Sequence, residues 1–250
     1  MGSLALVEER LSSAGLDLAE RAVAITCESS LLDQRAHEEG WLGRLPMWDW
    51  VGGRTSMMSA VGLFPAALTG IDCRAVLRGA ALMDTWTRNL SVTENPAMMM
   101  ALSWLHATDG QAGRANVVLP YNDRLELFAK YLQQLIMESL GKRLDRSGVV
   151  VHQGLTVYGN KGATDQHAYV QQLREGPDDH FVTFVEVLTP SSALATRETR
   201  PGVRADDILS ALLAGTRAAL AEVGRRHMTL TLTRLDEVRF GALVALFERA

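Results

Sequence analysis

Short apolar segments that alternate with helical segments constrain this chain more than any other feature. Residues 21–27 lack the polar and apolar alternation of a half-solvated strand, which predicts a short, fully buried strand. Residues 115–120 are also strand-like. Around these segments, apolar residues recur every three or four positions, which is typical of helices. The pattern favours an α/β fold with a parallel sheet flanked by helices.

The remaining elements follow from apolar spacing and from turn residues. An amphipathic helix is predicted over 122–139. Ser56 is predicted to cap a helix over 57–68, and the helix over 206–225 is expected to bury Ile208, Leu209, Leu212 and Leu213. Further helices are expected over 3–15, 72–88, 95–107, 164–174 and 240–249. Strands are expected from Val149, and over 181–188 and 228–235 with an alternating pattern.

Composition restricts the class of protein and of partner. The 250 residues are 47% hydrophobic, which is enough to bury a core. Lys and Arg number 25 against 29 Asp and Glu, and no basic tract stands out, so nucleic acid is not expected as a partner. No run approaches the ~20 apolar residues that cross a bilayer, and acidic residues interrupt the N-terminal segment where a signal peptide would be apolar. We therefore expect a soluble protein that does not engage a membrane.

The cysteines and histidines do not form a metal motif. Cys27 and Cys73 are too few for a disulfide framework, and with the six histidines they are not spaced as metal ligands. We therefore expect no metal. Sparse cysteine usage fits a reducing cytoplasm, which is the expected location.

Three segments carry residues suited to chemistry. Gly52-Gly53-Arg54-Thr55-Ser56 opens a predicted helix, where backbone N–H groups and a guanidinium can form an anion site. A tight turn with a structural arginine is the alternative. Gln134 and Glu138 are four residues apart, so on a helix they share one face. They form either a polar site or a solvated surface pair.

The third segment is a glycine-rich loop, 159–162, that leads into a predicted helix carrying Gln166 and His167. Histidine is the side chain best suited to proton transfer near neutral pH. A packed or solvated histidine is the alternative for His167. The other histidines have no motif around them.

Together these segments resemble the glucose-6-phosphate isomerase (phosphoglucose isomerase) family. The similar segments are 47–56, then Gln133-Gln134 with 137–139 and 141–142, then 162–168, and they follow the order of the family. Residues 240–248 resemble a fourth family segment. The likeness extends from about residue 20 to the end, and Thr55 stands where many members carry an aromatic residue.

The resemblance implies parallel-sheet sugar-isomerase domains flanked by helices. Residues 1–110 correspond to the rear part of a first domain and 111–250 to most of a second, with the polar segment 109–113 as the linker. The family interconverts glucose 6-phosphate and fructose 6-phosphate through an enediol, in glycolysis and gluconeogenesis, without a metal or an organic cofactor.

The resemblance also implies a role for individual residues. Glu138 matches the base that moves a proton between C1 and C2, and Arg54 matches the cation beside the enediolate. His167 matches the acid/base that opens the sugar ring, which in family homodimers comes from the neighbouring subunit. Gln134 and Gly53 are assigned to substrate binding.

Two parts of the family pattern have no counterpart here. The Ser/Thr-rich loop that holds the sugar phosphate lies upstream of the matched region, and the late catalytic lysine lies beyond the helix that holds Phe247 and Glu248. The expectation is therefore an internal piece of an isomerase whose sheet has open edges. The alternative is an inactive remnant that at most binds sugar phosphate or assists assembly. In either case we expect the chain alone to lack isomerase activity above background.

Overall fold

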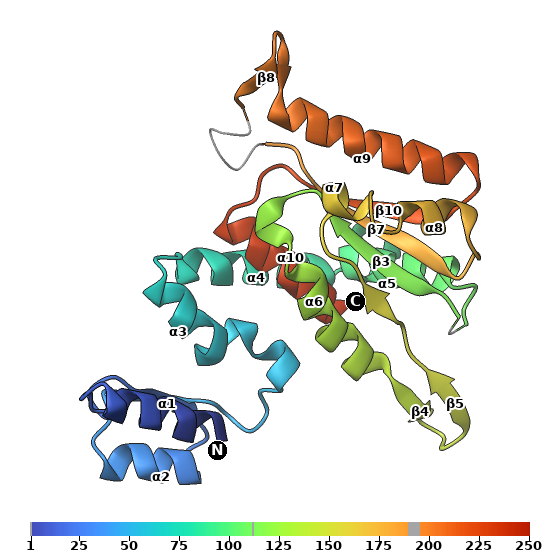
Figure 1. Ribbon diagram of the computed structural model, residues 1–250. Coiled ribbons are helices and arrows are strands. Elements are labelled where there is room, and N and C mark those ends of the chain that lie inside the picture. Colours follow the sequence, from blue (N-terminus) through green and yellow to red (C-terminus); the bar gives the residue numbers. More distant parts are fainter. Residues whose placement is uncertain (1, 112, 190–195) are drawn as a thin grey trace. The chain divides into compact units, whose positions relative to one another are not determined.

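The computed structural model describes residues 2–111, 113–189 and 196–250, which form two compact units (Figure 1). The first unit ends at Cys73 and the second runs from Arg74 to Ala250. This division differs from the predicted boundary between 110 and 111, because α4 (Cys73–Thr87) and α5 (Pro96–Ala107) pack with the C-terminal elements. The assignment of 1–110 and 111–250 to two sugar-isomerase domains stays a prediction.

The first unit is built around a small parallel sheet. Strand β1 (Val23–Thr26) pairs in parallel with β2 (Gly43–Pro46). The helical elements of the unit are α1 (Gly2–Ser13), α2 (Leu31–Glu38), the 3₁₀ helix η1 (Gly53–Met58) and α3 (Ala60–Leu68). The predicted full burial of 21–27 is wrong, since within β1 only Ala24 is buried. A sheet of two short strands cannot enclose both of its faces.

The second unit contains the larger sheet, which has the order β10-β7-β3-β6 with every pair parallel. Its strands are β3 (Ala115–Pro120), β6 (Val157–Tyr158), β7 (His180–Val187) and β10 (His227–Leu232). The predicted parallel sheet is confirmed. The alternation expected for 181–188 is wrong, because β7 lies inside the sheet and is buried from His180 through Val185.

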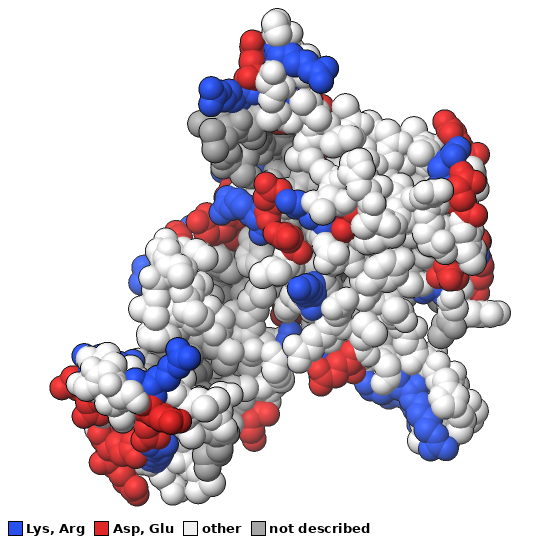
Figure 2. Space-filling model, viewed as in Figure 1, with Lys and Arg blue, Asp and Glu red and all other residues white. Residues whose placement is uncertain are grey.

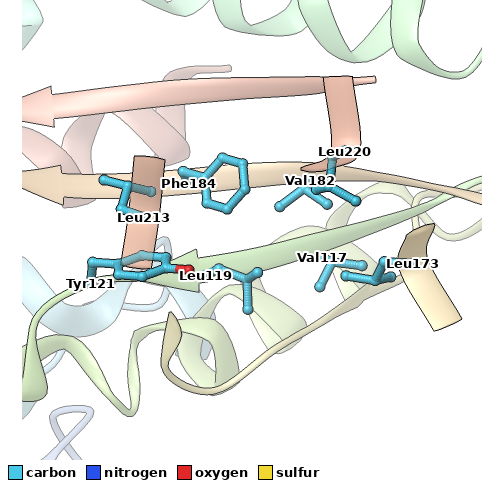
Figure 3. Packing of buried hydrophobic residues seen from close by; sticks show 8 residues of the cluster. All are labelled: Val117, Leu119, Tyr121, Leu173, Val182, Phe184, Leu213 and Leu220. Carbon is cyan, nitrogen blue, oxygen red and sulfur yellow. The ribbon is translucent and has the colours of Figure 1, made fainter. Parts of the chain in front are cut away.

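Helices cover both faces of this sheet. On one face, side chains of β3 and β7 pack against α8 (Val170–Glu175) and α9 (Ala205–Glu222) (Figure 3). This core cluster comprises Val117, Leu119, Tyr121, Leu173, Val182, Phe184, Leu213 and Leu220. On the other face lie α5 (Pro96–Ala107), α6 (Phe128–Leu132) and α10 (Glu237–Arg249), joined by ring contacts of Trp104 and Phe128 with Phe247. The other helical elements of this unit are α4 (Cys73–Thr87), α7 (Gly162–Asp165), the 3₁₀ helices η2 (Val92–Glu94) and η3 (Asp123–Leu125), and the π-helical turn η4 (Gln133–Glu138).

Two hairpins stand apart from the parallel sheet. Strands β4 (Lys142–Leu144) and β5 (Val150–Gln153) pair antiparallel, as do β8 (Glu198–Arg200) and β9 (Val203–Arg204). The predicted strand from Val149 is thus part of a hairpin, and its partner strand was not predicted. All residues of β4 and β5 are exposed, so no buried apolar face marks them in the sequence.

Several predicted helices differ in their bounds or burial. The helix expected over 164–174 is two short helices, α7 and α8, separated by a turn over 166–169. Ser59, and not Ser56, accepts the N-terminal hydrogen bond of α3, from the N–H of Val61. In α9, Leu213 is buried as predicted, whereas Ile208 and Leu212 are exposed because only one side of that helix faces the sheet.

Helices α4 and α10 cross at two glycines. A Cβ atom at Gly241 would lie 2.0 Å from the carbonyl oxygen of Val76, and one at Gly79 would lie 1.7 Å from that of Val238. Both obstacles are backbone atoms, so the helices can approach this closely only where side chains are absent.

We expect Gly241→Ala to destabilise the second unit by about 3 kcal/mol, because the added methyl group forces the two helices apart. Gly215→Ala is the matched control, since this glycine lies within α9 and, in the described part of the chain, no atom outside the adjacent helix backbone lies within 4 Å of the position that its Cβ would take. That substitution is expected to stabilise the protein by ~0.4–1 kcal/mol. Urea unfolding of both variants measures the difference, and equal stabilities would contradict the close crossing.

Candidate active site

The segment with Gly53 and Arg54 forms a 3₁₀ helix in the first unit. Its hydroxyl groups are used locally, because Thr55 Oγ1 donates to the carbonyl of Gly52 at 3.3 Å and Ser56 Oγ donates to that of Gly53 at 2.6 Å. These bonds hold the turn in place ahead of α3. The Arg54 side chain is partly exposed.

The local fold does not explain why residue 53 is glycine. Gly53 has no positive φ, and among the described residues no atom beyond its own chain neighbours lies within 4 Å of the position that a Cβ would take. Neither backbone conformation nor crowding therefore excludes a side chain in this position. An open backbone beside a guanidinium leaves room for a ligand to approach closely.

Gln134 and Glu138 lie on a π-helical turn, η4 (Gln133–Glu138), that continues α6. The Gln134 side chain donates from Nε2 to Glu138 Oε2 at 3.3 Å. Both side chains are exposed, whereas Leu135 and Ile136 between them are buried. The structure therefore brings this predicted pair together on one surface. Single π turns inside helices occur frequently at functional sites.

The end of this helix is held by a lysine that helical spacing alone does not indicate. Lys142 Nζ donates to the carbonyl oxygens of Glu138 at 3.2 Å, of Ser139 at 2.8 Å and of Gly141 at 3.4 Å. A cation at a helix C-terminus satisfies carbonyls that have no partner within the helix. The signal in the sequence is the Gly141-Lys142 pair directly after the predicted helix.

Basic side chains continue into the hairpin that follows. Lys142 and Arg143 of β4, with Arg146 of the turn, are exposed, and Figure 2 shows Lys and Arg side chains gathered over this hairpin. A cationic surface next to an exposed carboxylate favours the approach of an anionic ligand.

His167 is exposed in the turn between α7 and α8. Its backbone N–H donates to the carbonyl of Thr164 at 3.2 Å. The glycines before it are required by the fold, since a Cβ at Gly162 would lie 2.2 Å from the ring of Tyr121, and Gly159 has a φ of +136°. The loop consequently lies directly against the end of β3.

Glu138 and His167 lie at opposite ends of the strands of the larger sheet. Met137 and Gly141 line the same pocket as residues 113–115, at the amino end of β3. The loop before His167 instead packs on Tyr121, at the carboxyl end of that strand. The six residues of β3 separate the two ends by roughly 20 Å at ~3.3 Å per residue. One chain therefore does not bring this carboxylate and this imidazole together, and Arg54 belongs to the first unit.

The described part of the chain contains no cluster of three or more His, Cys, Asp or Glu side chains that could hold a metal ion. Within the same residues, no helix has the length and apolar character needed to cross a membrane.

Comparison with known proteins shows which family this chain resembles and over which residues. The family model described as "Phosphoglucose isomerase" matches residues 12–232. The chain is 59% identical over 242 residues to the glucose-6-phosphate isomerase of Synechococcus sp. (strain CC9902), and 54% identical over 244 residues to the chloroplastic glucose-6-phosphate isomerase 1 of Arabidopsis thaliana. These matches cover 96% and 98% of this chain but 45% and 40% of the relatives. The chain therefore spans less than half the length of these relatives.

Solved structures show the same fold. A hypothetical protein from Thermus thermophilus matches with a TM-score of 0.86 and 30% identity, over 99% of this chain and 60% of that one. A glucose-6-phosphate isomerase from Chlamydia trachomatis matches with a TM-score of 0.84 and 27% identity, over 98% of this chain and 49% of that one.

Proposed function

The chain belongs to the phosphoglucose isomerase family, and from that premise we propose that it supplies catalytic residues of a glucose-6-phosphate isomerase. The observation that carries this proposal is the π-helical turn, which exposes the paired Gln134 and Glu138 side chains while it buries the residues between them. A base that removes a proton from a substrate carbon must be accessible and held in position.

Glu138 is the proposed base for the proton transfer. It removes the C2 proton of the open-chain aldose, the C–H electron pair forms a C1–C2 double bond, and the carbonyl oxygen takes the negative charge. Transfer of the C2 hydroxyl proton to the C1 oxygen moves the negative charge to the C2 oxygen. Return of the carbon-bound proton from Glu138 to C1 then re-forms a carbonyl at C2 and gives the ketose. Arg54 is the proposed cation that stabilises the enediolate oxygen, and a fixed positive charge is most effective where charge develops.

The remaining residues bind the substrate and open its ring. Gln134 is proposed to bind a sugar hydroxyl, and Gly53 leaves room for the substrate beside Arg54. His167 is proposed to transfer the proton that opens the cyclic sugar. The proposed substrate is a sugar phosphate. The enzyme is proposed to act in the cytoplasm, in glycolysis and gluconeogenesis.

The positions of Glu138 and His167 at opposite ends of the strands support a homodimer. Because these residues lie at opposite ends of the strands within one chain, a single catalytic centre that uses both needs His167 from the partner subunit. Closed two-fold dimers are the most common symmetric assembly of soluble proteins.

One observation favours the second candidate, an inactive remnant. In the described part of the first unit the buried hydrophobic residues are Leu18, Ala24 and Ala36 alone, whereas Leu31 and Trp50 are each 74% exposed. So small a core contributes little stability. The first unit, which carries Arg54, then depends on further protein segments for its support.

An isomerase assay separates the two candidates. The chain itself is expected to show no turnover of fructose 6-phosphate above background in an assay coupled to a dehydrogenase. A chimaera in which this chain replaces the matched 45% of the Synechococcus relative is expected to turn over within about tenfold of the typical ~10 s⁻¹. A folded chimaera without activity would support the remnant and contradict the proposed function.

A further inference from the structure

The turn that carries His167 has little regular structure to hold it. Helix α7 spans four residues and β6 spans two, and His167 itself is exposed. A side chain that transfers protons must nevertheless be held within a narrow range of positions. The restraint therefore has to come from side chains around the turn.

The Asp165 carboxylate closes this turn from both sides. Asp165 is 2% exposed, and its Oδ2 accepts the backbone N–H of Asn160 at 2.9 Å and that of Lys161 at 3.1 Å. The same oxygen accepts the hydroxyl of Tyr169, which follows His167 by two residues. Hydrogen bonds to a buried carboxylate are roughly twice as strong as those between neutral groups.

A second anchor fixes the residue directly before His167. Gln166 Nε2 donates to the carbonyl of Leu212 at 3.1 Å and to the hydroxyl of Thr216, both on α9. Tyr121 at the end of β3 donates to the same hydroxyl at 3.1 Å. His167 is thus an exposed residue between immobilised neighbours on either side.

We propose that Asp165 is a positioning residue, which holds the 160–169 turn so that His167 points outward to the active site of a partner subunit. This inference rests on the proposed role of His167 in ring opening. Asp165 acts through the turn and does not itself contact substrate. The ammonium group of Lys161 pairs with Asp123, at 3.0 Å. The Asp165 carboxylate is bound by two backbone N–H groups, by the side-chain amide of Asn160 and by the hydroxyl of Tyr169.

The test compares Asp165→Asn with the matched control Asp123→Asn in the 250-residue chain. An amide at position 165 has one acceptor oxygen instead of two, and its own N–H donors would face the backbone N–H groups of Asn160 and Lys161. Asp123, in contrast, is an exposed carboxylate beside the same loop. The primary measurement is the NMR signal of the His167 imidazole Cε1–H, assigned by its absence in His167→Gln. Methyl signals of the core report whether each variant is folded.

In Asp165→Asn with an intact core, the His167 signal is expected to move toward the shift of a histidine in an unstructured peptide, and in Asp123→Asn it is expected to stay in place. An unchanged signal in folded Asp165→Asn overturns the proposal. If that variant does not fold, Tyr169→Phe decides, since it keeps the carboxylate and removes one hydrogen bond. A displaced signal then supports the proposal, and an unchanged one overturns it.

Kinetics separate this inference from the proposed function. In the chimaera, Asp165→Asn is expected to lower the rate on cyclic glucose 6-phosphate by about 10²-fold, the effect of a ~1 Å misplacement. The rate on a four-carbon aldose 4-phosphate, which has no hydroxyl placed to close a five- or six-membered ring, is expected to stay near that of the parent. Equal losses on both substrates overturn the positioning role, and an inactive parent chimaera contradicts only the proposed function.

Discussion

Glu138→Gln is expected to lower isomerisation by about 10²–10⁴-fold or more, because the amide keeps the size of the side chain and removes the basic oxygen. The helix should persist, since Glu138 is exposed and the buried residues of the turn are Leu135 and Ile136. The measurement is kcat for fructose 6-phosphate in the chimaera, with circular dichroism as the test of folding.

Glu126→Gln is the matched control for this substitution. Glu126 is also an exposed glutamate, directly after η3, and its replacement by glutamine makes the same change in charge. Its activity is expected to equal that of the parent. Near-normal turnover in Glu138→Gln would remove this residue from the role of base.

His167→Ala is expected to slow the cyclic substrate by about 10²–10⁴-fold and the open-chain substrate much less, because its proposed task is to open the ring. The exposure of His167 and its place in a turn make a large loss of stability unexpected. Parallel assays with glucose 6-phosphate and with the four-carbon aldose 4-phosphate provide the comparison.

His37→Ala controls for the loss of an exposed histidine, since His37 lies on α2 of the first unit and carries no assigned role. Both substrates should react at the parent rate in that variant. If His167→Ala slows both substrates equally, the residue binds the sugar generally or supports the fold, and it does not open the ring.

The sequence alone determined the elements whose apolar pattern reflects burial. Strand β3 and helices α4, α5 and α10 lie within a few residues of their predicted bounds, because each places apolar side chains against the sheet or against another helix. The motifs around Arg54, Gln134, Glu138 and His167 likewise indicated the family, which the match over residues 12–232 confirms. The catalytic roles of these residues stay predictions.

How these residues are presented depends on packing between distant parts of the chain. Nothing in the spacing of 122–139 predicts a π turn, because a π turn shifts the side-chain register by about one residue while the apolar residues stay buried. Around the break between α7 and α8, Asp165 accepts hydrogen bonds from Asn160 and Tyr169, and the loop before the break packs on Tyr121, contacts that helical spacing over 164–174 does not predict. The placement of Glu138 and His167 at opposite ends of the strands follows from the parallel pairing of β3 with β6, a non-local contact that periodicity along the chain does not encode.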